Sequence, residues 1–239
     1  MQILVWGTDP RFSVLIDELS KRGNVDERRD TNLDIEKYDI IILPMKGVSD
    51  NEFLKLLEKS KENVIIYTGL IGNLDKLNRK VISFLGDEEI RNKNDDITVD
   101  GIMDYVSGVK HDRVCILGFG HIGGKLYNRL KESSKVMVGV ILDSDKEILK
   151  DDAFYTFDEG TMIEILNDSD LIINTVPCNI INKKIASNLK TPILDIASYP
   201  HGIDSEVVNK NNLNYNLYLG IPGKYDPDRA GKILLKKFI

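Results

Sequence analysis

Short apolar runs alternate with amphipathic stretches along nearly the whole chain of 239 residues. An apolar run at 3–6 ends at a glycine, and the stretch 12–21 that follows carries apolar residues at the spacing of one helical face. Further apolar runs lie at 39–43 and 64–67. Strand-like runs that alternate with helical stretches are typical of a parallel sheet covered by helices on both faces. We therefore predict an α/β fold whose first half is flavodoxin-like.

The same alternation restarts in the second half, where an apolar run at 113–117 is followed by a glycine-rich turn. A helical stretch at 121–131 and another apolar run at 136–140 come next. This order of strand, turn, helix and strand opens a Rossmann dinucleotide-binding domain. Later strand-like runs lie at 171–174, 193–196 and 213–219.

A polar stretch at 86–96 separates the two halves and indicates either a surface connection or the crossing between domains. We place the domain boundary just after it. Residues 1–97 then form an N-terminal flavodoxin-like substrate domain, and residues 98–224 form a Rossmann domain that binds NAD or NADP. The last stretch, 225–239, is predicted to be a helix, capped by Asp226, that packs back on the first domain and completes it.

Composition places the chain among ordinary globular proteins, with 42% hydrophobic and 29% charged residues. The 32 Lys and Arg against 38 Asp and Glu leave a net charge of -6, which argues against nucleic acid or an anionic membrane as a partner. No apolar run approaches the roughly 20 residues that span a bilayer, and the first residues lack the features of a leader, so we expect a cytoplasmic protein. Cys115 and Cys178 show no spacing that suggests a metal site or a disulfide, and we expect both to be inert.

The segment 118–123 has the sequence Gly-Phe-Gly-His-Ile-Gly, a G-x-G-x-x-G pattern. The pattern alone is weak evidence, but here it follows a strand, opens a helix and precedes an acidic residue, Asp143, by about 20 residues. Gly118 permits the tight turn, Gly120 lets the backbone approach a pyrophosphate, and Gly123 lets helix and strand pack closely. The segment therefore predicts a dinucleotide site. The alternatives are a plain strand-to-helix turn or a Rossmann-like domain with an empty site.

Asp143 is expected to accept hydrogen bonds from the adenosine ribose, which favours NAD because a 2′-phosphate would meet a carboxylate. Ser144 and Lys146 follow closely and could turn toward a phosphate, so NADP stays open. A third interpretation is that Asp143 only caps the next helix. Asn174 and Thr175 end a later strand and are predicted to contact the nicotinamide ribose, with a simple turn as the alternative. The full set of predicted cofactor contacts is Gly118, Gly120, His121, Ile122, Gly123, Asp143, Ser144, Asn174, Thr175, Val176, Pro177, Asp195 and Ala197.

Several further motifs occur in a fixed order along the chain. They are Thr-Val-Asp-Gly at 98–101, Asn-Thr-Val-Pro at 174–177 and Asp-Ile-Ala-Ser-Tyr-Pro-His-Gly at 195–202. Gly-Ile-Pro-Gly at 220–223 and Ala-Gly at 230–231 follow at matching spacing. In this order the motifs resemble the family of the A subunit of dipicolinate synthase over nearly the whole chain.

The resemblance implies an enzyme that makes pyridine-2,6-dicarboxylate (dipicolinate) during bacterial sporulation. It implies oxidation of a dihydro- or tetrahydropyridine dicarboxylate with a nicotinamide cofactor, and it implies a partner in the form of a flavoprotein-like B subunit. The chain departs from the family's usual residues at Ile97 for proline, Asp100 for glutamate, Tyr199 for arginine and 141–143 for a basic residue. Because the last departure removes the usual basic residue, NAD stays open beside the family's NADP.

A substrate with two carboxylates requires cationic or backbone donors. Matched to the family's motifs, the candidates are Arg11, Lys224 and the N–H groups of Thr98 to Gly101, which we place at a helix start. Arg11 follows the first strand at the carboxyl edge of the sheet, and Asp9 could orient its guanidinium. The alternative is that Asp9 caps the helix and leaves Arg11 in water.

Loss of a hydride to the nicotinamide must be matched by loss of a proton to a base. Asp195, Ser198 and His201 follow a Rossmann strand and are predicted to lie near the nicotinamide, where His201 has a pKa range suited to accepting the proton. The alternative is that His201 is simply an exposed residue of a turn. We take His201, Asp100 and Ser198 as the candidate catalytic residues.

The leading interpretation is an NAD(P)-dependent oxidoreductase that acts on a small cyclic dicarboxylate, holds no metal and assembles as a homo-oligomer. A 2-hydroxyacid dehydrogenase shares this layout, but it needs an Arg, an acidic residue and a His in the second half at positions that we do not find convincingly. A third interpretation is a nucleotide-binding regulatory subunit that lacks catalysis.

Overall fold

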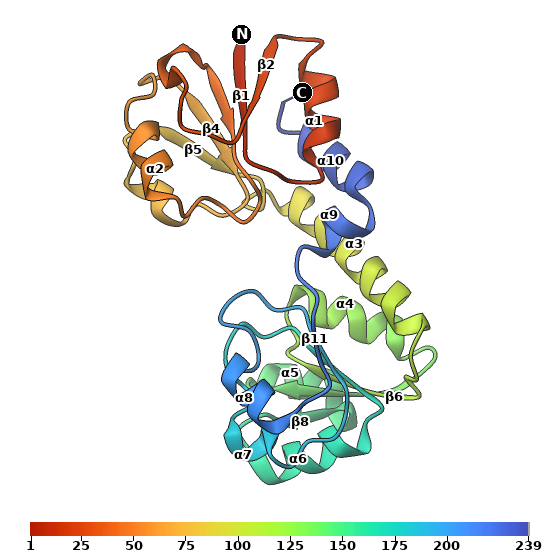
Figure 1. Ribbon diagram of the computed structural model, residues 1–239. Helices are drawn as coiled ribbons and strands as arrows, with labels where there is room; N and C mark the ends of the chain where they lie inside the picture. Colours follow the sequence, from red (N-terminus) through yellow and green to blue (C-terminus); the bar gives the residue numbers. More distant parts are fainter. Residues whose placement is uncertain (239) are drawn as a thin grey trace. The chain divides into compact units, whose positions relative to one another are not determined.

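The alternating runs of the sequence form two separate parallel sheets within residues 1–238, the part of the chain that the computed structural model describes (Figure 1). The chain divides into two units, each built around one sheet. The first unit consists of Met1–Ile97 together with the segment that starts at Pro222. The second unit consists of Thr98–Ile221.

In the first unit the strands pair in the order β2-β1-β3-β4-β5, and every pair is parallel. This is the flavodoxin-like order, so the predicted fold class is confirmed for this half. The predicted runs became the central strands, whereas the two edge strands, β2 and β5, were not predicted. Their bounds are β1 (Gln2–Trp6), β2 (Asn24–Arg28), β3 (Ile40–Ile42), β4 (Ile65–Thr68) and β5 (Lys80–Ser83).

Helices α1 (Phe12–Leu19) and α10 (Pro227–Leu235) pack together on one face of this sheet. Their contact is close, because a Cβ atom on Gly231 would lie only 2.8 Å from the carbonyl oxygen of Arg11. The side chain of Asp226 accepts a hydrogen bond from the third residue of α10 and caps it as predicted. The predicted return of the C-terminal helix to the first half of the chain is thus confirmed.

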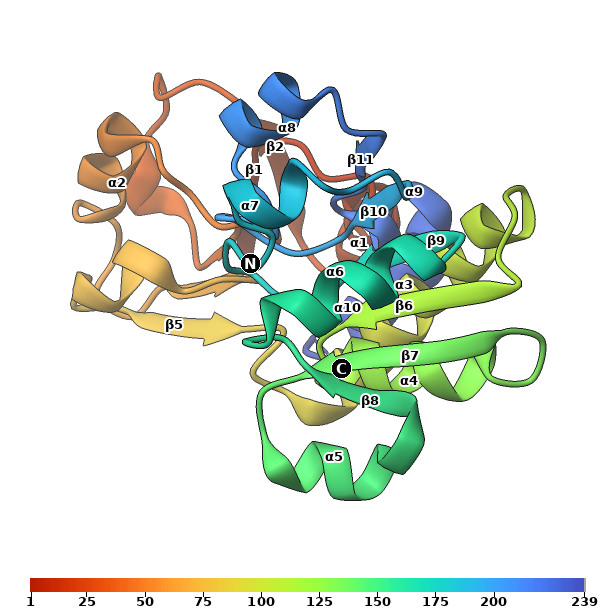
Figure 2. The same cartoon turned by 90° about the horizontal axis from the view of Figure 1, so that it is seen from below.

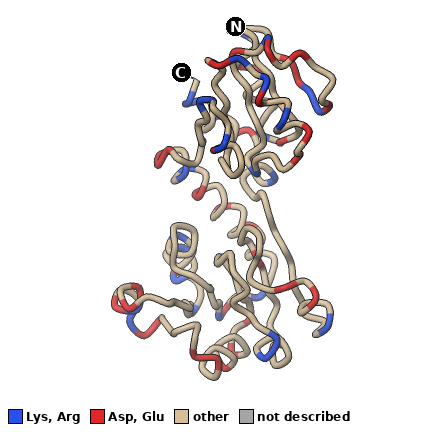
Figure 3. The backbone as a smooth tube through the Cα atoms, turned by 90° about the vertical axis from the view of Figure 1, so that its left-hand side faces the viewer, with Lys and Arg blue, Asp and Glu red and all other residues tan. Residues whose placement is uncertain are grey.

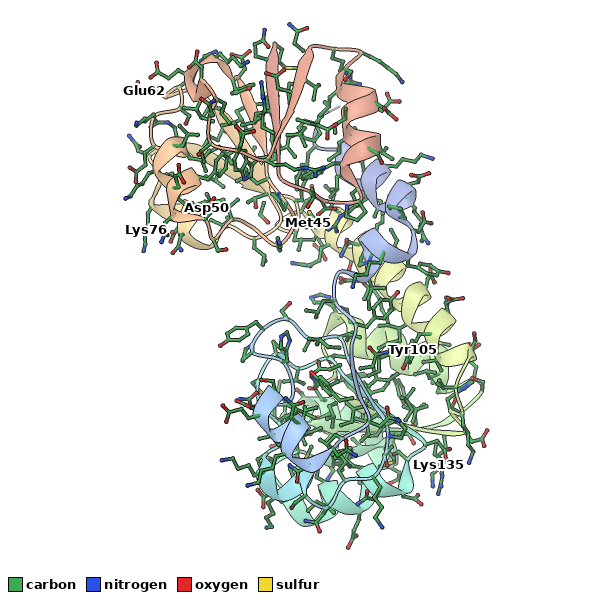
Figure 4. The ribbon with its side chains drawn as sticks, in the orientation of Figure 1. Met45, Asp50, Glu62, Lys76, Tyr105 and Lys135 are labelled. Carbon is green, nitrogen blue, oxygen red and sulfur yellow. The ribbon has the colours of Figure 1, made fainter. Side chains whose placement is uncertain are left out.

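The opposite face of the sheet is covered by α2 (Asn51–Leu57). Phe53 of this helix stacks on Trp6 of β1, with ring centroids 3.6 Å apart. Asp50 accepts hydrogen bonds from the first backbone N–H groups of α2 and so fixes its start (Figure 4). Alternate residues of β1 therefore face the two helical layers, as period-two burial requires. Short 3₁₀ turns occupy Ile35–Lys37 and Gly72–Lys76.

In the second unit the strands pair in the order β11-β10-β9-β6-β7-β8, again all parallel, and Figure 2 shows β6, β7 and β8 side by side. Renumbered from its first strand, this is the Rossmann order 3-2-1-4-5-6 read in reverse, which confirms the predicted fold. The strand that was not predicted, β8, is again an edge strand. The bounds are β6 (Arg113–Leu117), β7 (Lys135–Val140), β8 (Ala153–Tyr155), β9 (Leu171–Asn174), β10 (Ile193–Asp195) and β11 (Tyr215–Leu217).

Helices of the second unit cover both faces of its sheet. Side chains of α3 (Glu88–Ser107) and α4 join one hydrophobic cluster, and those of α6, α7 and α8 join the other. The helical bounds are α4 (His121–Leu130), α5 (Asp143–Leu149), α6 (Glu159–Asp168), α7 (Lys183–Ala186) and α8 (Ser205–Asn211), with a 3₁₀ turn at Lys150–Asp152. Helix α9 (Ile221–Tyr225) begins at the last residue of this unit and belongs otherwise to the first unit.

The polar stretch 86–96, predicted as a surface connection or as the crossing between domains, is mostly helical, and the boundary between the two units follows it. It forms the first half of α3 (Glu88–Ser107), the helix in which the boundary between the units falls. Its buried apolar residues in this half, Ile90 and Ile97, are seven apart and make a narrow stripe on a helix that is otherwise polar. Because these two residues stand among many charged ones, the hydrophobic periodicity that predicts a helix is weak in this stretch.

Charged residues of both signs are scattered along the backbone of both units (Figure 3). Among residues 1–238, no helix combines the length and the low polarity that crossing a bilayer demands.

Candidate functional site

The glycine-rich turn connects β6 to α4 and depends on glycine at two of its positions. Gly118 has φ +98°, and its N–H donates to the carbonyl of Gly139 on the neighbouring strand. A Cβ on Gly118 would lie 2.6 Å from the hydroxyl of Thr175. A Cβ on Gly123 would lie 2.1 Å from the carbonyl oxygen of Gly118. The turn and the first turn of α4 are therefore packed too closely for any other residue at these positions.

Gly120 differs from these two glycines because its surroundings are open. It is the N-cap residue of α4, it is exposed, and a Cβ placed on it would meet no atom of residues 1–238 within 4 Å. No side chain in this described part of the chain caps α4. The first backbone N–H groups of a helix lack helical acceptors and carry partial positive charge. This helix start thus fits an anion such as a pyrophosphate, which is the test that a dinucleotide site has to pass.

Asp143 lies beyond the end of β7, where the adenosine end of a dinucleotide is expected. It is the first residue of α5 and accepts a hydrogen bond of 2.5 Å from the hydroxyl of Tyr155 on β8. The hydrogen bond to this carboxylate raises the pKa of the Tyr155 hydroxyl, because ionisation would remove the proton that the carboxylate accepts. The N-cap of α5 is Leu142, so the interpretation of Asp143 as a helix cap is wrong.

The neighbours of Asp143 do not form a basic pocket. Lys146 lies over the Tyr155 ring, with its ammonium 4.0 Å from the ring centroid. Ser144 is exposed on the first turn of α5. Ile141 and Leu142 are exposed apolar residues at the end of β7. A carboxylate beside apolar side chains suits an unmodified ribose better than a phosphorylated one.

Asn174, a predicted cofactor contact, ends β9 and uses its side chain within the chain. It is fully buried, and its amide bonds to both the N–H and the carbonyl of Val176 and to Asp195. Thr175 is turned toward the glycine-rich turn, where its hydroxyl donates to the carbonyl of Leu117 at 2.9 Å. Both side chains hold the turn in place. Pro177, the next predicted contact, is exposed.

Asp195 ends β10 and is also fully buried, so its prediction as a cofactor contact is wrong. Its carboxylate accepts four hydrogen bonds within the described chain, and these occupy both oxygens. The donors are the side chains of Asn174 and Tyr215 and the backbone N–H groups of Ala197 and Gly202, at 2.8 to 3.0 Å. Burial and this carboxylate together raise the pKa of Tyr215. Ala197 is buried in the same network.

His201 lies in the loop after β10, half-buried and with φ +70°. Its Nδ1 is 2.8 Å from the carbonyl oxygen of Ala197, and its backbone N–H donates to the carbonyl of Ser198. Its ring meets the highly exposed ring of Tyr199 edge to face, with centroids 5.9 Å apart. The Ser198 side chain is exposed. Tyr199 and His201 thus present an aromatic, hydrogen-bonding surface at the position where the resembled family has arginine.

The other candidates of this half lie on α3. Thr98 and Gly101 belong to the interior of that helix, so their N–H groups serve the helix itself and the prediction of a free helix start there is wrong. Asp100 forms an ion pair with Arg129 of α4 at 3.0 Å, which ties two helices together. Further along α3, Tyr105 accepts a hydrogen bond from the side chain of Asn216 (Figure 4).

In the first unit, Arg11 and Asp9 form a buried ion pair at the carboxyl end of β1. The Nε and Nη2 atoms of Arg11 donate to the two carboxylate oxygens of Asp9 at 2.6 and 2.7 Å. Asp9 also accepts from the backbone N–H of Met45, labelled in Figure 4, at 3.3 Å. The orientation of the guanidinium by Asp9 is as expected, and the alternative of Arg11 in water is wrong because this residue is 7% exposed. Lys224 is exposed on α9.

Three residues of these networks were not found from the sequence. Tyr215 lies on an edge strand and Tyr155 ends a strand that was not predicted, so neither could be placed next to its carboxylate. Gly202 had a usable signal, because a glycine often marks a position where the backbone approaches another group closely. A Cβ on Gly202 would indeed lie 2.3 Å from the Asn174 amide nitrogen.

Comparison with known proteins supports the resemblance noted in the sequence. No protein-family model matches the chain. The curated A subunit of dipicolinate synthase from Bacillus subtilis (strain 168) is 27% identical, over an alignment that covers 88% of this chain and 78% of that protein. The resemblance to this family is therefore confirmed at the level of sequence.

Solved structures show that the fold is shared. The crystal structure of the A subunit of dipicolinate synthase from Bacillus halodurans matches with a TM-score of 0.81 at 22% identity, covering 99% of this chain and 96% of that one. Apo D-lactate dehydrogenase from Escherichia coli matches with a TM-score of 0.68 at 12% identity, covering 100% and 95%. The NAD-dependent formate dehydrogenase of Staphylococcus aureus in complex with NAD matches with 0.65 at 14%, also covering 100% and 95%. The chain therefore has a dehydrogenase-like architecture.

Proposed function

We propose that the chain is an NAD(P)-dependent oxidoreductase of the dipicolinate synthase type, which oxidises a dihydro- or tetrahydropyridine dicarboxylate to dipicolinate. The observation that carries the proposal is the uncapped start of α4 behind Gly120, in a chain that resembles the A subunit of dipicolinate synthase over 88% of its length. The relative's name supplies the reaction, and the helix start supplies a place for its cofactor.

The cofactor is held by backbone rather than by side chains. The N–H groups at the start of α4 bind the pyrophosphate, and Gly120 leaves room for its approach. Asp143, oriented by Tyr155, accepts the ribose hydroxyls, and its charge disfavours a 2′-phosphate. We therefore propose NAD as the preferred cofactor, against the family's NADP. When bound, the nicotinamide supplies a hydride acceptor.

Oxidation of a dihydropyridine dicarboxylate removes a hydride and a proton, and the ring becomes aromatic. A tetrahydropyridine substrate requires this twice. The chain's own task is to orient the substrate and take the proton. His201 is proposed as the proton acceptor, because its Nδ1 is bonded to a carbonyl oxygen and its Nε2 carries the lone pair of the neutral ring. Asp100 and Ser198 are not needed for this step, given the ion pair of the one and the surface position of the other.

Arg11 is proposed to bind a substrate carboxylate with the guanidinium donors that Asp9 does not use. The ion pair fixes the plane of the guanidinium, and Nη1 together with the second Nη2 hydrogen faces away from Asp9. The pair as a whole is neutral, so it contributes direction more than charge. Lys224 is the second candidate for this task.

The chain is further proposed to work with a second, flavoprotein-like subunit, because its curated relative is by name one subunit of a larger enzyme. We also propose that the chain forms a homo-oligomer and that it acts during sporulation. A non-catalytic regulatory subunit is the outcome that the following experiment has to exclude.

Two measurements test the proposal. Calorimetry with NAD(H) and NADP(H) should show binding of a nicotinamide dinucleotide, with NAD preferred. The chain with dihydrodipicolinate and NAD, alone and with a flavoprotein-like subunit, should then produce the ultraviolet absorbance of the pyridine product. If neither nucleotide binds to folded protein, the assignment as an oxidoreductase is lost. If nucleotide binds but no product forms in either setting, the substrate assignment is lost.

Arg11→Lys separates the substrate site from the cofactor site. Lysine retains the charge beside Asp9 but lacks the planar fork, so KM for the dicarboxylate should rise about tenfold while Kd for NAD is unchanged. The matched control is Arg22→Lys in the same unit, where the guanidinium donates to the carbonyl of Phe238. Equal effects of the two variants on KM would contradict the role of Arg11.

A further inference from the structure

The buried carboxylate of Asp195 binds both ends of one loop. Its Oδ1 accepts the N–H of Ala197 at 3.0 Å, and its Oδ2 accepts the N–H of Gly202 at 2.8 Å. The six residues from Ala197 to Gly202 thus start and finish on the same side chain. A flexible loop of this length would otherwise sample many conformations.

The same carboxylate also links the loop to the two neighbouring strands. Asn174 at the end of β9 donates to Oδ1 at 2.9 Å, and Tyr215 on β11 donates to Oδ2 at 2.8 Å. All four donors are neutral groups, and Asp195 itself is completely buried. A buried carboxylate is tolerated only when its hydrogen bonds are satisfied. We therefore expect the loop to keep its conformation only while all four donors are bonded to Asp195.

The network is fitted closely enough to require glycine at the end of the loop. A Cβ on Gly202 would lie 2.3 Å from the amide nitrogen of Asn174 and 3.1 Å from Oδ2 of Asp195. The backbone must approach the carboxylate closely for the N–H of Gly202 to donate. We call the Asp195 carboxylate with its four hydrogen-bond donors the loop clamp. Glycine is required at position 202 by this clamp and not by a turn.

His201 is held by this loop through two contacts. Its backbone N–H donates to the carbonyl of Ser198, and its Nδ1 lies 2.8 Å from the carbonyl oxygen of Ala197. A carbonyl oxygen only accepts, so Nδ1 must carry the proton and Nε2 must carry the lone pair when the ring is neutral. Ala197 is also the residue whose N–H is bound by Asp195. The peptide group next to the clamp therefore sets the tautomer of the imidazole.

We propose that Asp195 is a positioning residue, which holds the loop 197–202 so that neutral His201 keeps its Nδ1–H form and presents Nε2 as the proton acceptor. The inference rests on the proposed function, in which His201 takes the proton. It assigns no contact with substrate or cofactor to Asp195. It predicts the tautomer of neutral His201, which can be observed in the absence of turnover.

Long-range ¹H–¹⁵N spectra of the full chain at a pH where the ring is neutral give the test. The chain has 3 histidines, so His201→Gln assigns the signal of interest by its disappearance. In the wild type the His201 signal should be that of the Nδ1–H form, which is the minor form of the neutral ring in free histidine. Asp195→Asn and Tyr215→Phe should both shift it toward the Nε2–H form, because each loosens the carboxylate that binds the loop.

Tyr215→Phe protects the test against a variant that fails to fold, since it removes one hydroxyl from a half-buried edge residue. The matched control is Tyr38→Phe in the first unit, where the hydroxyl donates to Asp26 at the same 2.8 Å. It should leave the His201 signal unchanged. In turnover assays, Asp195→Asn should lower kcat about 100-fold and Tyr215→Phe about tenfold, with Kd for NAD unchanged in both.

The outcomes separate this inference from the proposed function. A wild-type signal of the Nε2–H form, an unchanged signal in folded Tyr215→Phe, or an equal shift in Tyr38→Phe would each overturn the positioning role. Absence of nucleotide binding or of product, with the tautomer shifts as expected, would remove the proposed function and the catalytic meaning of the clamp but leave the clamp itself.

Discussion

The carboxyl ends of the two sheets carry two opposite kinds of site. At the start of α4 in the second unit, backbone N–H groups stand without a side-chain cap within the described chain, and Gly120 leaves the space in front of them open. At the end of β1 in the first unit, Arg11 and Asp9 neutralise each other with little contact to water. The helix start leaves its N–H groups for a ligand, whereas the guanidinium of Arg11 already gives two of its five N–H donors to Asp9.

This difference shows what each site can gain from a ligand. An uncapped helix start gains acceptors that it lacks, so an anion there improves the hydrogen bonding of the protein. The Asp9–Arg11 pair is already satisfied, and a substrate carboxylate adds to it only through the remaining guanidinium donors. Affinity should therefore reside mainly in the cofactor site, whereas the pair should govern orientation. The following predictions probe that contrast.

The largest effect is expected when the buried pair is broken. Asp9→Ala leaves the guanidinium of Arg11 buried without its carboxylate and removes the acceptor of the Met45 N–H, which should destabilise the protein by about 3–5 kcal/mol. The measurement is urea unfolding followed by fluorescence of the single tryptophan, Trp6, which lies on β1 of the same unit.

The control for this prediction is Glu18→Gln, which breaks an exposed ion pair with Lys21 on α1. Exposed pairs contribute little, so its urea midpoint should stay close to that of the wild type. If Asp9→Ala is as mild as this control, the pair is not buried in solution and the contrast between the two sites fails.

A backbone collision in the glycine-rich turn should have the next largest effect. Gly123→Ala places a Cβ 2.1 Å from the carbonyl oxygen of Gly118, so the turn and the helix must move apart. We expect this to lower the free energy of unfolding by about 3 kcal/mol. Circular dichroism during urea unfolding measures this loss. The control is the adjacent Gly124→Ala, whose Cβ would be 3.7 Å from the Phe119 ring and should be neutral or slightly stabilising.

Gly120→Ala should separate binding from folding. Its Cβ would meet no atom of the described residues within 4 Å, so the unfolding free energy should stay within about 0.5 kcal/mol of the wild type. The same methyl group would occupy the approach to the helix start, and the Kd for NAD should rise at least about tenfold. The control for calorimetry is Gly160→Ala on α6, whose Cβ would be in ordinary contact with Oδ1 of Asp158 at 3.6 Å. Unchanged affinity in Gly120→Ala would show that the open helix start is not where the dinucleotide binds.

The contrast between the sites also explains what the sequence could predict. Glycines at 118 and 123 are required by space, and space is a local property of a strand, turn and helix, so the turn was predictable. The central strands were equally predictable, because continuous apolar runs mark a buried parallel strand. The strands that escaped prediction, β2, β5 and β8, are edges, where one side faces no neighbour and the apolar signal is weaker.

The side-chain roles could not be predicted in the same way, because they depend on partners far along the chain. Asp195 was expected to meet the cofactor, but Asn174 and Tyr215, each about 20 residues away, bind its carboxylate instead. Arg11 is covered in part by the C-terminal segment, since a Cβ on Gly223 would lie 3.5 Å from its Nε. Sequence position indicates which end of a sheet a residue occupies, but not whether another strand has already used its polar atoms.

The smallest effect concerns an exposed ion pair in the same unit as the buried one. Glu89 on α3 contacts Lys236, just beyond α10, and Lys93 at 2.7 Å, and these ammonium groups lower its pKa to about 2. Because the folded pKa lies below the ordinary value of 4.5, the carboxylate stabilises the fold above about pH 5, and this contribution is lost as pH falls toward 2. Glu89→Gln should lower the urea midpoint slightly at pH 7 and not at pH 2. The matched control is Glu62→Gln, at an exposed glutamate before β4 (Figure 4). If the urea midpoint of this control changes with pH by as much as that of Glu89→Gln, then Glu89 does not contribute specifically to holding α3 against the C-terminal segment.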